Sequence, residues 1–235
     1  MNKCCAFFRQ SFLSLLLLLS IEPASAQMTY FNTEPAFKKP AVQIGFKYAY
    51  IAPLNNFGME FSRSPQYELY CQLRNQDGNG RLSGRIGIYY TSPAPRMDSI
   101  PAYLIYESNG TTLYPGYVSY QKFYMSGIFI EYAYRIVRYK GFALDAGLGL
   151  TIGKYRMEYD EGYTGMLTQK GIIEETTAGL RMHLALAYQI NRYFEIYGEA
   201  MNSQITQTDW STKFPNNTYG LGVNFTFNPR SKNEY

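Results

Sequence analysis

The sequence predicts an all-β protein, a single eight-stranded antiparallel up-and-down β-barrel that spans a membrane. Apolar residues recur at every second position in eight segments, and the connections between those segments alternate between long and short. The 235 residues include 24 Tyr and 15 Phe. Period-two alternation is typical of strands with one apolar face. Long loops at one end, short turns at the other and aromatic girdles are typical of transmembrane barrels.

A soluble protein is the alternative that composition leaves open. A Tyr-rich β-sandwich would share the same residue content. A soluble lipocalin-type barrel, however, has no reason to alternate long and short connections, so the alternation favours the membrane interpretation.

The first 26 residues have the pattern of a secretory signal peptide. Lys3 and Arg9 supply positive charge, Phe12–Ile21 is apolar, and an Ala-Ser-Ala cleavage signal ends at Ala26. The apolar stretch is too short for a spanning helix. We therefore expect cleavage after Ala26 and export, with residues 27–40 as a periplasmic lead-in. An exported chain without a spanning helix is either soluble or a β-barrel.

Charge and cysteine content exclude several classes of function. Cleavage would remove two of 22 basic residues and one of 18 acidic residues, which changes the net charge from +4 to +3. The charges are scattered, so we expect no nucleic-acid partner. Cys71 would be the one cysteine left, which precludes an internal disulfide, and no Cys/His spacing suggests a metal or a cofactor.

Eight segments carry the strand pattern, and we expect the barrel to occupy residues 41–227. In chain order the predicted strands are Ala41–Ile51, Tyr67–Arg74, Arg81–Thr91, Tyr120–Ile136, Phe142–Tyr155, Ile172–Ile190, Tyr193–Thr206 and Thr218–Phe227. One face of each strand is apolar and is expected to face lipid. The residues of that face are Val42, Ile44, Phe46, Tyr48, Tyr50, Tyr67, Leu69, Cys71, Leu73, Leu82, Ile86, Ile88, Tyr90, Ile128, Ile130, Tyr132, Tyr134, Ile136, Phe142, Leu144, Ala146, Leu148, Leu150, Ile152, Leu180, Met182, Leu184, Leu186, Tyr188, Phe194, Ile196, Tyr219, Leu221, Val223, Phe225 and Phe227.

The last strand shows the alternation most clearly. Its second face consists of Thr, Gly and Asn, whereas a water-facing strand surface would usually carry charges. Repeated Gly suits a crowded barrel lumen, where neighbouring backbones leave little room. The length matches the roughly 9–11 residues of a transmembrane strand.

The connections between the predicted strands alternate between long loops at one end of the barrel and short turns at the other. The expected short turns are 75–80, 137–141 and 191–192, and the expected long loops are 52–65, 92–119, 156–171 and 207–217. In the first long loop Phe57, Met59 and Phe61 alternate, which predicts that part of it extends the second strand. In the second, Asn109-Gly110 is a strong hairpin signal between two short strand-like stretches. We expect that loop to stand up as a protruding β-hairpin.

Charged residues recur on the inward faces of the strands. In a low-dielectric lumen they have to be paired. An eight-stranded barrel has an interior only just wide enough for side chains. We therefore expect a nearly neutral network that plugs the lumen, with a charged selective pore as the alternative. The expected lumen residues are Lys47, Glu68, Arg85, Glu131, Arg135, Asp145, Arg181, His183, Glu195 and Glu199.

At this point the sequence resembles a known family. The signal peptide, the eight strands and the Gly-x-Gly-x-Asn-Phe-x-Phe ending at 220–227 resemble the small outer-membrane β-barrels of the OmpA/OmpX type, with Tyr and Asn usage most similar to members from Bacteroidota. The resemblance covers Ala41–Phe227. It implies insertion by the outer-membrane assembly machinery, directed by a final strand that ends in an aromatic residue, and no catalysis. Phe227 fits that role if the polar residues 228–235 are an overhang.

His183 is the only histidine and the one candidate for catalysis. Lipid-modifying barrels use His with Ser or Asp, but the His-x-Ser arrangement of the deacylase-like barrels is missing, because position 185 is Ala. A hydrogen-bonded lumen histidine is the simpler interpretation.

We therefore expect a non-enzymatic integral protein of the cell outer membrane, surrounded by outer-membrane lipid and without a cofactor. Its exposed loops would act as a structural or binding component of the envelope or of a larger envelope assembly, with a surface polymer or an envelope protein as partner. The expected contact is the loop 92–119, because tyrosines on loops are good interface anchors. Those tyrosines are Tyr103, Tyr106, Tyr114 and Tyr117. The alternative function is a narrow channel for small solutes.

Overall fold

The computed structural model of the protein describes residues 40–75, 81–96, 100–107, 111–163, 169–207 and 213–227, with the backbone alone for 100–107, 111–115 and 163. Nine strands and one short helix make up this part. They are β1 (Ala41–Pro53), α2 (Asn55–Glu60), β2 (Ser64–Arg74), β3 (Leu82–Thr91), β4 (Ile100–Glu107), β5 (Thr111–Tyr139), β6 (Phe142–Tyr163), β7 (Gln169–Gln189), β8 (Phe194–Gln207) and β9 (Lys213–Thr226). Among these residues, no helix is long and apolar enough to cross a membrane.

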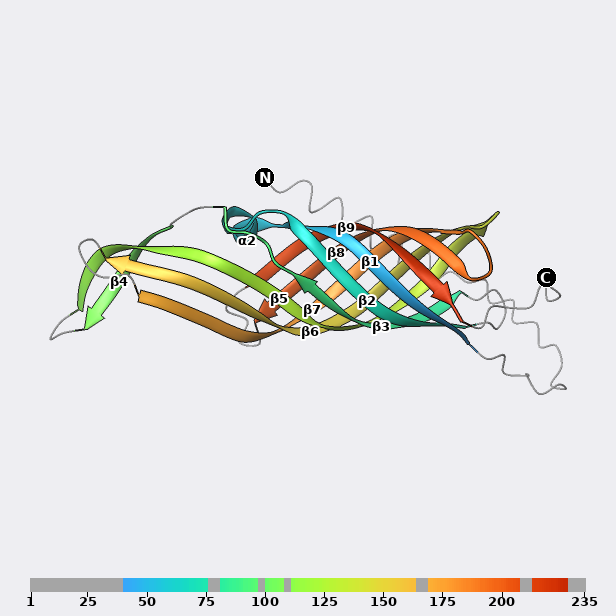
Figure 1. Cartoon of the computed structure of the whole chain (residues 1–235), viewed down its shortest axis with the longest axis horizontal. Coiled ribbons are helices and arrows are strands. Elements are labelled where there is room, and N and C mark those ends of the chain that lie inside the picture. Colours follow the sequence, from blue (N-terminus) through green and yellow to red (C-terminus); the bar gives the residue numbers. More distant parts are fainter. Residues whose placement is uncertain are drawn as a thin grey trace, which may run out of the picture. The chain divides into compact units, whose positions relative to one another are not determined.

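Eight of the nine strands form a closed antiparallel barrel. Consecutive barrel strands pair with each other, β1 pairs with β9, and β3 pairs with β5, so the ring has no open edge. The short strand β4 lies outside the ring and pairs with the beginning of β5 (Figure 1). The predicted eight-stranded up-and-down barrel is confirmed.

The two faces of the barrel follow the alternation of the sequence. All of the residues predicted to face outward are exposed or half-buried on the outer face. In β1, for example, Ile44 and Phe46 are each 46% exposed, whereas the preceding Gln43 and the following Lys47 are buried. The barrel is therefore apolar outside and polar inside, the reverse of a water-soluble protein.

Short turns close the end of the barrel where β1 begins. Lys140 and Gly141 have φ angles of 47° and 88°, and they connect Tyr139 to its partner Phe142. Two consecutive residues with positive φ are typical of a type I′ hairpin, whose twist matches that of the strands. The turn is shorter than the predicted 137–141, because β5 continues past a bulge between Arg135 and Val137.

The prediction for the first long loop holds only at its end. β2 begins at Ser64, three residues before its predicted start, but residues 55–60 form α2 instead of extending β2. Phe57 and Phe61 are buried at 3% and 2% exposure, while Met59 between them is 60% exposed. A strand would place all three side chains on one face, whereas a helical turn places residues four apart together.

The loop end of the barrel carries more strand than predicted. The protruding hairpin is confirmed, but β5 is continuous from Thr111 and does not start at Tyr120. Likewise, β6 runs to Tyr163 and β7 starts at Gln169, so most of the predicted loop 156–171 is paired. We call β4 and residues 111–122, 154–163 and 169–176 the extension (Figure 1). At about 3.3 Å per residue, the β6 part is about 30 Å long, measured along the strand.

Several predictions fall on residues outside the described part. These are the signal peptide with its cleavage site, the lead-in up to residue 39, most of the turn 75–80, the hairpin tip Asn109-Gly110 and the tail 228–235. The fourth long loop is shorter than predicted, because β9 begins at Lys213.

Candidate functional site

The structure places all ten of the predicted charged and histidine residues inside the barrel. Each has at most 7% of its surface exposed. They come from β1, β2, β3, β5, β6, β7 and β8, and they gather into two separate clusters along the barrel axis.

The first cluster is a closed ring of alternating charges, which we call the charge ring. Each of its three cations contacts two carboxylates, and each carboxylate contacts two cations. Lys47 Nζ lies 2.9 Å from Glu68 Oε2 and 2.5 Å from Glu199 Oε1. Arg181 lies 2.6 Å from Glu68 Oε1 through Nη2 and 3.0 Å from Glu131 Oε1 through Nε. Arg85 Nη1 lies 3.0 Å from Glu199 Oε2 and 3.4 Å from Glu131 Oε2.

The second cluster lies toward the turn end and includes a residue that the sequence analysis missed. Arg135 forms a bidentate ion pair with Asp145, through Nε to Oδ1 at 2.7 Å and Nη2 to Oδ2 at 2.9 Å. Its Nη2 also lies 3.1 Å from Glu195 Oε2. Arg74 contacts the same two carboxylates, at 3.1 Å to Glu195 and 3.6 Å to Asp145. Arg74 is six positions from Glu68 in β2, so strand periodicity alone places it on the inward face.

Both clusters are electrically balanced. The charge ring has three cations and three carboxylates, and the second cluster has two of each. Burying unpaired charge is costly, so balance is what a stable lumen needs. In the described part of the chain, no group of three or more His, Cys, Asp or Glu residues is arranged to hold a metal ion.

Two tyrosines, Tyr70 and Tyr197, fill the space between the clusters, and we call them the tyrosine layer. The Tyr70 hydroxyl lies 2.7 Å from that of Tyr197 and 2.5 Å from Asn224 Oδ1. Each ring lies across a glycine of a neighbouring strand: a Cβ at Gly45 would be 2.1 Å from Tyr70 Cζ, and one at Gly222 would be 2.2 Å from Tyr197 Cζ. The inward-facing glycines thus provide room for aromatic rings.

His183 lies inside the lumen beside the charge ring. Among the described residues neither ring nitrogen has a hydrogen-bond partner, and Nδ1 is 3.8 Å from Glu131 Oε2. Its ring lies against Gly147, where a Cβ would be 2.2 Å from Cε1. With 4% of its surface exposed, His183 does not reach the outer face of the barrel.

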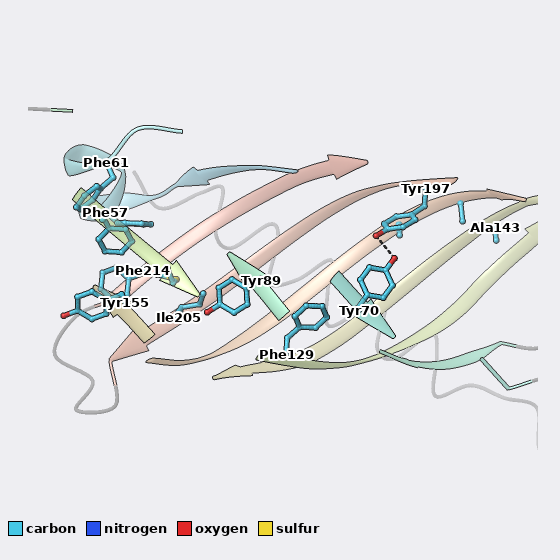
Figure 2. Close-up of a cluster of buried hydrophobic side chains, with 14 residues drawn as sticks. Phe57, Phe61, Tyr70, Tyr89, Phe129, Ala143, Tyr155, Tyr197, Ile205 and Phe214 are labelled. Carbon is cyan, nitrogen blue, oxygen red and sulfur yellow. Dashed lines mark hydrogen bonds between the residues drawn. The ribbon is translucent and has the colours of Figure 1, made fainter. Parts of the chain in front are cut away.

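An aromatic cluster closes the loop end of the lumen, and the sequence analysis did not predict it. We call it the lid. Phe57 lies in α2 and Phe61 directly follows it, whereas Tyr155 and Phe214 come from β6 and β9 (Figure 2). Phe123 of β5 belongs to the same cluster. The ring centroids of Phe61 and Phe123 are 4.7 Å apart, and those of Tyr155 and Phe214 are 4.9 Å apart. The lid could have been recognised in the sequence from aromatic residues at inward strand positions, which are otherwise polar.

Backbone hydrogen bonds hold α2 over the lid. The Leu54 N–H donates to the Pro215 carbonyl at 2.9 Å, and the Arg96 N–H donates to the Glu60 carbonyl at 2.8 Å. Burial raises the pKa of the Glu60 carboxyl. Burial also raises the pKa of Tyr120, and the neighbouring Glu60 carboxylate raises it further.

Little free space remains between the lid and the charge ring. A cavity of ≈ 10 Å³ lies there, which is about the space for one water molecule. Its lining combines apolar and polar side chains from both layers. They include Ile51, Gln66, Tyr89, Met125, Thr151, Arg181, Met201, Ser203, Ile205 and Asn216.

The predicted loop contact lies in the extension. The backbones of Tyr103 and Tyr106 belong to β4, and those of Tyr114 and Tyr117 belong to β5. Tyr117 is 38% exposed and lies across Gly162 of β6, where a Cβ would be 2.6 Å from its ring. The side chains of the other three tyrosines lie outside the described part.

No known protein-family model matches the chain, and no curated protein matches it either. Solved structures do resemble it. Neisserial surface protein A has a TM-score of 0.48 at 13% identity, over 79% of this chain and 97% of that one. A major outer membrane protein from Thermus thermophilus has a TM-score of 0.46 at 11% identity, over 79% and 99%. Ail, the attachment invasion locus protein of Yersinia pestis, has a TM-score of 0.44 at 12% identity, over 81% and 100%.

The closed ring of strands and its two faces define the architecture. Eight antiparallel strands enclose a polar, charged interior and present an apolar surface, which is the construction of a transmembrane β-barrel.

Proposed function

We propose that the protein is a non-enzymatic integral outer-membrane barrel with a plugged lumen. It acts through its exposed loop end as a structural or binding component of the cell envelope or of a larger envelope assembly. The observation that carries this proposal is the combination of a filled lumen with a sheet that projects from one end. The ion pairs and aromatic contacts of the interior stabilise the barrel. The surface available to a partner lies outside the barrel.

The apolar outer face of the barrel supports the proposal that the barrel is embedded in lipid. Isoleucine, leucine and phenylalanine side chains of the barrel strands are about half exposed there, as with Ile88 at 56% and Leu184 at 54%. The apolar face of β6 continues to Ile152, and the next outward residue is Lys154. Such a change from apolar to charged residues is expected where a strand leaves the hydrocarbon layer.

Three layers support the plugged lumen. The lid, the charge ring and the tyrosine layer lie one after another along the barrel, and the charge ring closes on itself without an unpaired group. Because the interior of an eight-stranded barrel is only just wide enough for side chains, ions would have to displace these contacts in order to pass.

The surroundings of His183 support a role other than catalysis. A general base has to reach a proton of the substrate. His183 is enclosed by lumen side chains. The charged groups that interact electrostatically with its ring are Glu131, Glu199, Arg85 and Lys47. Its buried position favours a packing role in the lumen.

The extension is the proposed contact with a partner, which is a surface polymer or an envelope protein. Removing the hairpin tests this directly. A variant in which residues 100–117 are replaced by a short Gly-Ser linker should still insert, because these residues contribute no strand to the barrel ring. Pull-downs from native envelopes should recover a partner with the wild type and lose it with the variant. Identical recovery with both proteins, when both show the heat-modifiable gel mobility of a folded barrel, would contradict the proposal.

A further inference from the structure

The two faces of the extension carry different charges. Residues directly opposite each other in an antiparallel pair share a face, so the register assigns each side chain. The outer face carries the cations Lys122, Lys154, Arg156 and Lys170, together with the carboxylates Glu158, Asp160 and Glu174. Ion pairs form on this face, between Lys154 and Glu174 at 3.5 Å and between Arg156 and Glu158 at 3.1 Å.

The inner face has carboxylates but no cation among the described residues of the extension. Glu161 of β6 and Glu175 of β7 project from it, because they share this face with Val118 and Tyr155, their respective partners in the register. Glu60 of α2 adds a third carboxylate at the base, next to Tyr120. The inner face is therefore negative, and no described cation of the extension neutralises it.

The same face is also apolar. Tyr120, Met157 and Ile173 are partly buried against the lid, and the ring of Tyr120 stacks on Phe61 with centroids 5.6 Å apart. Farther out, Tyr159 lies across Gly171 of β7, where a Cβ would be 2.2 Å from its ring. An aromatic surface continues in this way from the lid along the extension.

This surface is open in the described part of the chain. Beyond the barrel, β5, β6 and β7 pair only with one another and with β4. Tyr159, Met157 and Ile173 each keep part of their surface exposed. Exposed aromatic and aliphatic groups bordered by charge are typical of an interaction site.

We infer that the inner face of the extension binds a cationic, partly apolar segment of a protein partner. This inference rests on the proposed function and decides between the two partner classes named there. Basic side chains of the segment would meet Glu60, Glu161 and Glu175, while its apolar side chains would lie on the tyrosine and methionine surface. An anionic surface polymer would be repelled by the same carboxylates, because like charges at an interface disfavour binding.

The test uses the full-length protein in a non-ionic detergent and three fluorescent probes. They are a peptide of alternating Lys and Val, the matching peptide of Glu and Val, and dextran sulfate as a polyanion. Fluorescence anisotropy should show binding of the Lys-Val peptide only, and added NaCl should weaken it because exposed charges are screened. Preferential binding of dextran sulfate would overturn the inference in favour of a polymer.

Matched variants locate the site. E161Q/E175Q removes two carboxylates from the inner face, and E158Q/E174Q removes two from the outer face. Each inner carboxylate should contribute about fivefold to the affinity for the Lys-Val peptide, which corresponds to about 1 kcal/mol. Likewise, I173S on the inner face should weaken binding, whereas I172S on the adjacent outer position should not. Equal effects of the inner and outer variants would overturn the inference.

The hairpin deletion distinguishes failure of the inference from failure of the proposed function. If a native partner is lost on deletion but is retained by E161Q/E175Q, the inference fails and the proposed function stands. If neither change affects the partner, both fail. Residues 100–117 include none of the inner-face carboxylates Glu60, Glu161 and Glu175. The inference therefore expects loss of the partner with E161Q/E175Q and its retention with E158Q/E174Q.

Discussion

Replacing Arg181 with Met should open the charge ring at one point. Arg181 joins Glu68 and Glu131, at 2.6 and 3.0 Å, and its guanidinium lies 4.1 Å from the centre of the Phe129 ring. R181M would leave two cations facing three carboxylates. Breaking a buried ion pair by removing one partner costs about 3–5 kcal/mol, because the remaining charge is buried without compensation. We expect a loss of that size in the free energy of unfolding.

A second substitution separates lost charge balance from lost packing. R181M/E68Q restores the balance to two cations and two carboxylates, since Lys47 keeps Glu199 and Arg85 keeps both of its partners. Removing both members of a pair costs less than stranding one of them. The double variant should therefore recover about 2 kcal/mol relative to R181M.

Urea unfolding in detergent micelles or lipid bilayers measures both variants. Folded and unfolded fractions can be read from heat-modifiable gel mobility, with the wild type and E68Q as references. The reasoning would be refuted if R181M unfolds at the same urea concentration as the wild type, or if the double variant is less stable than R181M.

Three further variants and one labelling experiment test other parts of the barrel. Phe123→Ala, in the lid, should lower the free energy of unfolding by about 3–5 kcal/mol, and an unchanged urea midpoint would show that the lid adds no stability. Gly222→Ala should lower the free energy of unfolding by about 1–3 kcal/mol, because the added Cβ would collide with the Tyr197 ring. In Gly84→Ala the added Cβ would have no neighbour closer than 3.7 Å, so this variant should be nearly neutral in the same assay. Cys71 lies at an outward position of β2, so a charged thiol reagent should label it after unfolding and not in a bilayer; rapid labelling of the folded protein in lipid would contradict a lipid-facing surface.

The barrel and most of its lumen were predictable because strand periodicity fixes the direction of each side chain. In β7, Arg181 and His183 alternate with Leu180 and Met182, so the inward residues can be identified without knowing which strands are neighbours. The charge ring itself was not predictable, because its closure depends on distances between strands that are distant in the sequence. Arg74 was missed although the same periodicity identified Glu68 in its own strand.

The lid and the extension show what periodicity does not determine. Phe57 and Phe61 fit a strand and a helix equally well, and the choice depends on their packing with Phe123 and Phe214 from distant strands. Proline suggested a loop, yet Pro101 lies in β4, an edge strand of the described sheet, where a missing N–H can face solvent. The pairing of β4 with β5, and of β5 with β6, overrides these local signals.

Conductance measurements on the wild-type protein in planar bilayers test the plugged lumen most directly. A lumen closed by the lid, the charge ring and the tyrosine layer should give no steady single-channel steps at any salt concentration or voltage that leaves the barrel folded. R181M, with its stranded carboxylate, should be the variant that admits water and shows leak current. Steady, ion-selective steps from the wild type, with only the ion preference altered in R181M, would contradict the plug and establish a narrow channel.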